Sequence, residues 1–416
     1  MNSGNRPSTI FNVTVLVASL GYFVDIYDLL LFTIVRVPSL QALGVSQTEI
    51  DTGVGPLLIS VQMLGLLVGG IFWGIIGDKK GRLRVLFGSI LLYSIANIAN
   101  GFVTGTNGYL FWRFVAGLGL AGELGAGITL VAEILPKEKR GYGTMIVATI
   151  GVSGAVAANL IAKLVPDWRY CYFIGGGLGL ILLFLRISVL ESGMFNSTVE
   201  SKTVDRGNFL SLFTDRTRFL KYLKCILLGT PTWFVVGILI AFSNKFAVEM
   251  GVKEPISPGD AVAFCYAGLV LGDFTSGLIS QLLKSRRKVM MLFLLLTAVC
   301  VGIYLNLFGV EKWLFYTVCF ILGFSVGFWA IFVTIAAESF GTNLRATVAI
   351  TVPNFARGML PLLVLMFSGL QHYITYLQSG AVMAVFCIVI ALIASYSIEE
   401  TFGKDLDYIE PVGHKK

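Results

Sequence analysis

The sequence predicts an all-α membrane protein whose twelve transmembrane helices form two six-helix bundles related by pseudo-symmetry. Three observations support this fold class. The chain carries too little charge to be soluble, its apolar runs are long enough to cross a bilayer, and its second half repeats the first. Together they exclude an arrangement of soluble domains.

Composition excludes a soluble fold. Hydrophobic residues make up 56% of the 416 residues, charged residues make up 13%, and the mean hydropathy is +0.82. A soluble globular protein carries about 25% charged residues. The net charge of +7 arises from basic residues in short loops, a pattern typical of membrane orientation and not of nucleic-acid binding. The six cysteines lack metal-ligand spacing, and we expect them in the core.

Apolar runs bounded by charged and turn residues predict the spans. A transmembrane helix needs about 20 apolar residues. The predicted spans are 11–35, 54–77, 84–103, 109–132, 143–164, 170–190, 222–243, 260–283, 288–308, 313–336, 346–369 and 376–398. The polar stretch between spans six and seven divides the chain. We therefore expect an N-terminal bundle over 1–190, a cytoplasmic linker over 191–221, a C-terminal bundle over 222–398 and a cytoplasmic tail over 399–416.

Charge bias predicts the orientation of the spans. The loops 78–84 and 284–288 are rich in lysine and arginine, and such loops face the cytoplasm. Trp112, Trp168 and Trp313 each lie at the expected outer end of an even-numbered span, where indole rings favour the membrane interface. Both termini are therefore predicted to be cytoplasmic.

The second half of the chain repeats the first. Glu133 and Arg140 recur 205 residues later as Glu338 and Arg345, and the loop 74–84 recurs 203 residues later. Because each copy holds six spans, the two copies run parallel. Halves of this kind enclose a site near the midplane of the membrane.

Several segments resemble known signatures. The loop GIIGDKKGRLR (74–84) is similar, residue for residue, to the signature between spans two and three of the major facilitator superfamily. Other segments that resemble this superfamily are RFVAGLGLAGELGAG (113–127), Trp168-Arg169, ESGMF (191–195), ETFGKDL (400–406) and VDIYDLLLF (24–32). ESGMF and ETFGKDL resemble the acidic motifs that end each half in sugar porters, organic-ion transporters and metabolite:proton symporters, and VDIYDLLLF looks most like the metabolite and aromatic-acid:proton symporters. The resemblance implies the major facilitator fold and secondary active transport. One departure is Gln281, which stands where the first copy has Asp78.

Charges inside the spans that occur in only one half are candidates for function, because a charge at the centre of a membrane helix costs about 2.5–3.5 kcal/mol. Asp25 and Asp28 share one face of span one. The resemblance implies that one of them pairs with Arg113 of span four as a protonation switch. A fixed structural ion pair is the alternative. Glu123, also in span four, has three candidate roles: a second proton site, a gate partner or a structural hydrogen-bond partner.

Arg357 of span eleven lies near the midplane, and Asn354 shares its face. A guanidinium there suits a substrate carboxylate, which it can bind through two parallel hydrogen bonds. The alternative is an ion pair with Glu123 or Asp273. Four aromatic residues on spans that are expected to line the cavity are candidates for its wall, although such residues more often only pack; they are Tyr22, Tyr27, Trp233 and Trp329.

The repeated charges at the loop ends are predicted to close the cytoplasmic side in the outward-facing state, since carboxylates can hold helix N-termini. We expect this cytoplasmic gate to contain Asp78, Arg82, Glu133, Arg140, Asp273, Glu338 and Arg345. Asp273 is interpreted as a gate or packing residue. Because Gln281 replaces one aspartate, the gate is predicted to be asymmetric. Pro231, Pro353 and Pro361 are predicted to interrupt spans seven and eleven.

No catalytic constellation, metal cluster or nucleotide-binding glycine loop is present in the sequence, so we expect no enzyme activity, no cofactor and no use of ATP. The leading hypothesis is a proton-coupled symporter of a small organic, anionic metabolite that acts by alternating access. A drug or metabolite efflux antiporter, an uncoupled sugar or nucleoside facilitator and a receptor on the same fold are the alternatives. We expect a monomer in a bacterial inner membrane.

Overall fold

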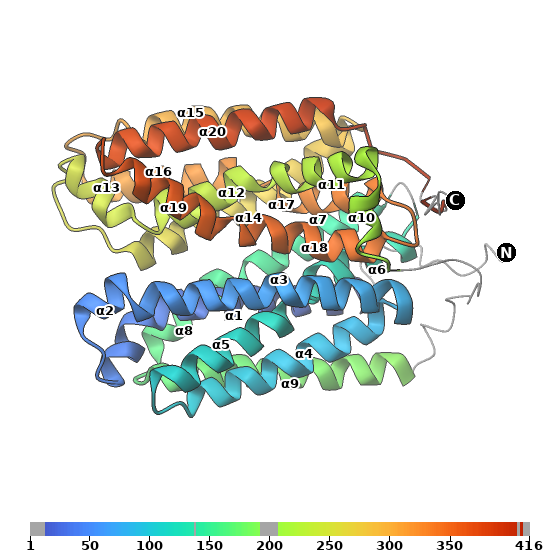
Figure 1. Ribbon diagram of the computed structural model, residues 1–416, viewed down its shortest axis with the longest axis horizontal. Helices are drawn as coiled ribbons and strands as arrows, with labels where there is room; N and C mark the ends of the chain where they lie inside the picture. Colours follow the sequence, from blue (N-terminus) through green and yellow to red (C-terminus); the bar gives the residue numbers. More distant parts are fainter. Residues whose placement is uncertain (1–12, 137–138, 192–206, 406–407, 411–416) are drawn as a thin grey trace.

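The computed structural model describes residues 13–136, 139–191, 207–405 and 408–410. Within these residues the chain is helical and contains no strand, and twelve helical segments are long and apolar enough to cross a membrane. The predicted fold class and number of spans are therefore confirmed. The two halves lie side by side as separate helical bundles (Figure 1).

The first bundle holds six spans, and three of them consist of two helices each. Its helices are α1 (Val13–Ala42), α2 (Gln47–Thr52), α3 (Val54–Lys80), α4 (Arg82–Gly101), α5 (Thr106–Leu120), α6 (Glu123–Ile134), α7 (Arg140–Val152), α8 (Gly154–Leu164) and α9 (Trp168–Glu191).

The second bundle repeats this plan. Its spans begin with Arg216, ahead of the predicted start at 222, and end with Ser397. Its helices are α10 (Ser211–Thr214), α11 (Arg216–Leu228), α12 (Thr230–Phe234), the π-helix η1 (Val235–Ile240), α13 (Ser243–Glu249), α14 (Pro258–Leu282), α15 (Arg286–Tyr304), α16 (Lys312–Ser325), α17 (Trp329–Ser339), α18 (Arg345–Gly358), α19 (Leu360–Leu370) and α20 (Tyr376–Ser397).

Helix breaks recur at matching positions of the two halves. Span four breaks at 121–122 and span ten at 326–328. Pro231 and Pro361 stand in the first turns of α12 and α19, where the missing backbone N–H costs nothing. Pro353 lies inside α18, which continues through it, so the predicted interruption occurs at two of the three prolines.

Glycines set the close packing that the two halves share. A side chain at Gly65 or Gly69 of α3 would strike the backbone of α5, and one at Gly268 or Gly272 of α14 would strike the backbone of α16. The two pairs are 203 residues apart, as in the sequence repeat. Small residues allow membrane helices to approach closely, so the duplicated sequence produces the same helix pair twice.

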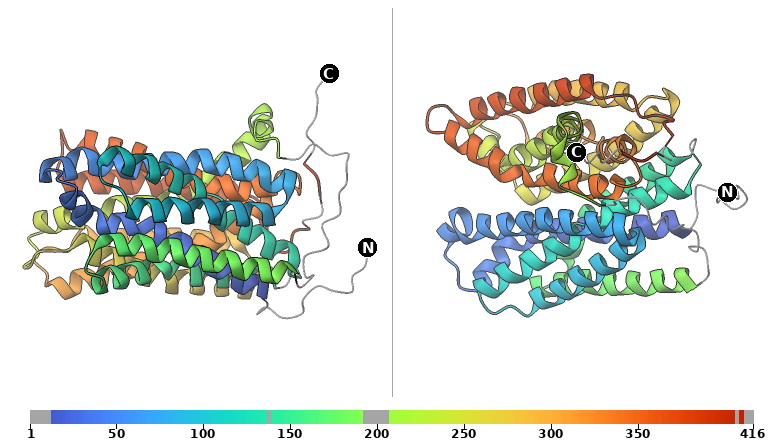
Figure 2. Two further views of the ribbon diagram at one scale, coloured as in Figure 1. Left: turned by 90° about the horizontal axis from the view of Figure 1, so that it is seen from below. Right: turned by 45° about the vertical axis from the view of Figure 1, so that its right-hand side comes forward.

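The interface between the bundles forms along their inner helices. From the first bundle α3, α6 and α7 contact α18, α17 and α14 of the second. Figure 2 shows the two bundles facing each other from two further directions. The end of the molecule that carries the Asp78 loop is called cytoplasmic, as the charge bias predicts.

Candidate functional site

The cytoplasmic end is held by a carboxylate of one bundle that caps a helix of the other. Asp78, at the end of α3, accepts hydrogen bonds from the backbone N–H groups of Ala346 (3.0 Å) and Thr347 (2.8 Å). These N–H groups belong to the first turn of α18, where they lack partners within the helix. The negative charge also favours the positive end of the helix dipole. Asp78 therefore links the two halves.

Arginine side chains connect the loop-end carboxylates. Arg82 forms an ion pair with Glu133 at 2.8 Å and lies 3.5 Å from Asp78. Arg345, at the start of α18, crosses the interface to Glu133 at 3.5 Å. The Nε of Arg140 donates a hydrogen bond to the carbonyl of Leu135. Five of the residues predicted for the gate therefore lie at this end: Asp78, Arg82, Glu133, Arg140 and Arg345.

The corresponding cluster of the second bundle differs. Glu338 pairs with Arg286 at 3.5 Å and accepts a hydrogen bond from Thr401 at 2.8 Å. Gln281 lies against Gly141 at the start of α7, and its amide nitrogen has no hydrogen-bond partner among the described residues. On this side no carboxylate of the described residues takes the place that Asp78 holds on the other, which is the predicted asymmetry.

Asp273 lies within the second bundle. Its Oδ1 accepts a hydrogen bond from the backbone N–H of Ala330 at 3.1 Å, so it holds the first turn of α17 after the break in span ten. Of the two roles expected for Asp273, gate or packing, this geometry corresponds to packing. Asp273 does not join the cluster of charges at the loop ends.

Asp25 and Asp28 of α1 are fully buried, and none of their carboxylate oxygens forms a hydrogen bond of normal geometry with a described residue. Arg113 interacts electrostatically with Asp28, but the two do not approach within 4 Å as an ion pair. Arg357 of α18 interacts electrostatically with Asp25 across the interface between the bundles. The two aspartates therefore face different arginines.

Aromatic rings surround Arg113. Its guanidinium carbon lies 5.1 Å from the ring centre of Phe32 and 5.9 Å from that of Tyr172. Asn97 lies beside Asp28, and the absence of a side chain at Gly175 makes room for that carboxylate. All three guanidinium nitrogens of Arg113 are sealed from solvent and unpaired in the described part of the chain.

Arg357 also lies against aromatic rings, but it is not sealed completely. Its guanidinium carbon lies 5.9 Å from the ring centre of Trp233 and 5.7 Å from that of Trp329, and the two indoles meet edge to face at 6.1 Å. Only its Nε is both sealed and unpaired, so its terminal nitrogens retain accessible surface. Neither Glu123 nor Asp273 forms an ion pair with Arg357, so the alternative role of Arg357 as their structural partner is removed.

The remaining predicted substrate residues differ in their contacts. Asn354 donates to the carbonyls of Ala121 in the first bundle and Ile350 in its own helix, both at 2.8 Å, and its Oδ1 has no partner in the described part of the chain. Tyr22 interacts electrostatically with Arg357. Tyr27 donates to the carbonyl of Cys171 at 3.0 Å, a contact within the first bundle.

Glu123 has a partner that sequence reasoning did not identify. Arg186 of α9 binds both of its carboxylate oxygens, and Ser89 donates to one of them at 3.3 Å. A side chain at Gly21 would occupy the space of this pair. The signal in the sequence was an arginine inside the apolar run of span six; its partner could not be deduced from spacing.

A second feature that the sequence did not indicate lies at the outer end. Lys163, the last charged residue of α8, pairs with Asp260 at the start of α14 at 2.7 Å. The two residues belong to different bundles; the Lys163 side chain is 60% exposed and that of Asp260 is 34% exposed. The pair therefore links the halves opposite the Asp78 contact.

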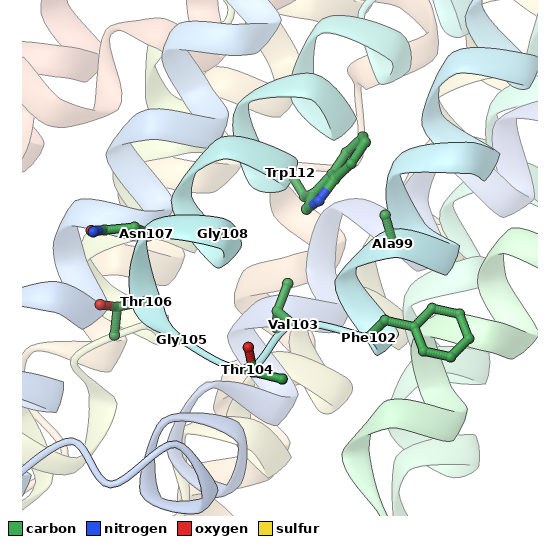
Figure 3. Close-up of a pocket in the computed structure, with 9 residues that line it drawn as sticks. All are labelled: Ala99, Phe102, Val103, Thr104, Gly105, Thr106, Asn107, Gly108 and Trp112. Carbon is green, nitrogen blue, oxygen red and sulfur yellow. The ribbon is translucent and has the colours of Figure 1, made fainter.

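A surface pocket of about 570 Å³ lies at the outer turn between the third and fourth spans (Figure 3). None of the residues predicted for substrate, proton or gate lines it. It is lined by Ala99, Phe102, Val103, Thr104, Gly105, Thr106, Asn107, Gly108 and Trp112.

Comparisons with known proteins agree with this geometry. The family model described as Major Facilitator Superfamily matches residues 18–352. A protein of Haemophilus influenzae named "Putative metabolite transport protein" is 27% identical and covers 94% of this chain and 96% of its own. The cis,cis-muconate transport protein of Acinetobacter baylyi is 27% identical over 83% of this chain and 85% of its own.

Among solved structures, the proton:xylose symporter XylE superposes with a TM-score of 0.74 at 15% identity and covers 97% of this chain and 98% of its own. At this identity the match shows the fold alone. Together with the family model and the twelve spans, it establishes what kind of protein this is. The chain belongs to the major facilitator superfamily and is an integral membrane transporter of metabolites, not an enzyme.

Proposed function

We propose that the chain carries a small anionic organic metabolite together with protons, by alternating access between the two bundles. The observation that carries this proposal is Arg357. It is 2% exposed at the interface, has no carboxylate or hydrogen-bond partner among the described residues, and interacts across the interface with Asp25.

Arg357 supplies the anion site. A charge inside a membrane protein is costly, and the charges that are found there typically mark a substrate or ion pathway. Here the faces of Trp233 and Trp329 stabilise the cation without using its N–H groups. The terminal nitrogens stay available for a carboxylate, which a guanidinium binds through two parallel hydrogen bonds. The indole walls suit the apolar part of an organic acid.

Asp25 and Asp28 supply the proton sites. Neither carboxylate forms an ion pair within 4 Å in the described part of the chain, and burial without a directly paired charge disfavours the ionised form. When a substrate anion neutralises Arg357, Asp25 loses the nearby positive charge and is favoured to hold a proton. We assign Asp25 to coupling with the substrate, and Asp28 with Arg113 to a second step within the first bundle. In this proposal Glu123 is bound by Arg186 and serves as a structural partner of the proton sites.

Alternating access uses the two linked ends. The Asp78 contact closes the cytoplasmic side, and the pair Lys163–Asp260 contributes to closure of the outer side. Each must separate when its side opens. Both bundles lie in one chain, so a monomer contains the complete transport unit. Of the relatives named above, the muconate transport protein supports an organic acid as the substrate.

Uptake into proteoliposomes tests the proposal. A panel of small organic acids is measured with and without an inward proton gradient. Accumulation above the external concentration should require the gradient. Asp25→Asn should abolish accumulation and leave exchange of internal for external substrate intact, whereas Glu254→Gln, at an exposed site, should change neither. Equal accumulation with and without the gradient would exclude proton coupling and favour the uncoupled facilitator.

A further inference from the structure

The short loop between α17 and α18 is held from two sides by segments that lie far away in the sequence. Its residue Asn343 is 1% exposed and precedes Arg345, the first residue of α18, by two positions. The backbone N–H groups that follow it, those of Ala346 and Thr347, are the ones that Asp78 binds. Whatever holds this loop therefore positions the helix end at which the two bundles are linked.

The C-terminal tail holds the loop on one side. The side chain of Asn343 accepts from the backbone N–H of Glu410 at 2.9 Å and donates to its carbonyl at 3.1 Å. The backbone N–H of Thr342 donates to the carbonyl of Tyr408 at 2.9 Å. Lys221 of α11 pairs with the Glu410 carboxylate at 2.9 Å. The tail is thus tied both to the loop and to span seven.

The linker between the bundles holds the loop on the other side. The backbone N–H of Gly207 donates to the carbonyl of Asn343 at 2.9 Å. A Cβ at Gly207 would lie 2.8 Å from the carbonyl oxygen of Ile75 and 3.3 Å from the Cβ of Asp78, so only glycine fits beside these residues of the first bundle. Gly207 has a φ of +65°, a conformation that glycine adopts without strain. Gly207 therefore contacts both bundles beside the Asp78 bond.

We propose that Asn343 is a positioning residue of the cytoplasmic gate and that the tail residues 408–410 form a strap that holds the loop at Asn343 in the position that the closed gate requires. The strap acts on the alternating access described above, so it rests on that part of the proposed function. When the cytoplasmic side opens, Asp78 leaves α18. Gly207 then cannot keep both its packing against Asp78 and its bond to Asn343. A hydrogen bond that forms only in the closed state and breaks on opening favours the closed state by about three- to ten-fold.

The strap gives the tail a regulatory role. Residues 408–410 join the rest of the protein through hydrogen bonds and one ion pair, which release more readily than a packed helix. A ligand or modification that detaches them should favour opening toward the cytoplasm without any change at the substrate site.

The test reads the conformation of the gate directly. Ile350, buried on α18 against Gly77 and Gly125, is replaced by cysteine as a reporter, and its reaction with a membrane-impermeant maleimide is followed from the cytoplasmic face. The six native cysteines are buried, and the parent protein measures their background. Two variants are compared with the reporter alone: a chain that ends before Tyr408, and Gly341→Ala.

Gly341→Ala releases the strap without shortening the chain. A Cβ at Gly341 would lie 2.6 Å from the backbone nitrogen of Glu410 and 2.8 Å from the carbonyl of Tyr408, both backbone atoms. The matched control is Gly302→Ala, since a Cβ at that helical position meets nothing within 4 Å.

Both strap variants should react about five- to ten-fold faster than the reporter alone, and the control should react at the same rate. If the shortened chain fails to fold, the labelling rate of Gly341→Ala alone tests the proposal. Unchanged reaction rates in folded variants would overturn the proposal. Because labelling requires neither substrate nor a gradient, it tests the strap even if proton coupling proves wrong.

Discussion

Replacement of Asp78 by asparagine should weaken the closed state of the cytoplasmic side. The carboxylate now accepts hydrogen bonds from the N–H groups of Ala346 at 3.0 Å and Thr347 at 2.8 Å. Asparagine keeps one acceptor oxygen, but its NH₂ group would face the other N–H group. One charge-assisted hydrogen bond and the favourable interaction with the helix dipole are lost. Together these losses amount to about 2 kcal/mol, or a change of about thirty-fold in the equilibrium between closed and open states.

The cysteine reporter at Ile350 measures this change. Asp78→Asn should increase its rate of reaction from the cytoplasmic face by a factor of about ten or more, whereas Glu254→Gln should leave the rate unchanged. Gln281→Glu, at the equivalent position of the other half, should slow the reaction, because a carboxylate there faces the start of α7 at Gly141. If Asp78→Asn reacts at the parental rate while the protein remains folded, the helix-capping argument is wrong.

Three further predictions concern the substrate site, a buried ion pair and a capping carboxylate. Arg357→Lys keeps the charge but loses the planar fork, so uptake should show a KM raised about ten-fold or more; an unchanged KM would place the anion elsewhere. Arg186→Leu leaves the carboxylate of Glu123 buried and unpaired, which should cost about 3–5 kcal/mol and lower the Tm in a thermal-shift assay, while the double variant with Glu123→Gln should recover most of the loss. At Glu400 burial raises the pKa, but hydrogen bonds from Ser285 and from backbone N–H groups outweigh it and hold the pKa below its ordinary value of 4.5. Its contribution to stability is therefore complete above about pH 4.5 and is lost as the pH falls through the lower, folded value. The fall in Tm between about pH 7 and about pH 3.5 should accordingly be smaller in Glu400→Gln than in the parent, and equal falls would contradict this reasoning.

The sequence by itself determined the number of spans, the duplication and the set of charges worth examining. These properties depend on local composition: a bilayer requires apolar runs of a given length, and a buried charge is costly whatever its partner. The loop-end residues Asp78, Glu133 and Arg345 could be selected as a gate because the repeat placed their counterparts in the other half.

Only the tertiary structure decided which charges meet. Glu123 and Arg186 lie 63 residues apart, and Asp25 interacts with an arginine of the other bundle. Such pairings depend on how each helix is rotated and tilted against its neighbours, and spacing along one helix does not define this. The same holds for Asn343, whose position exists only because two distant segments, the linker and the tail, converge on one loop.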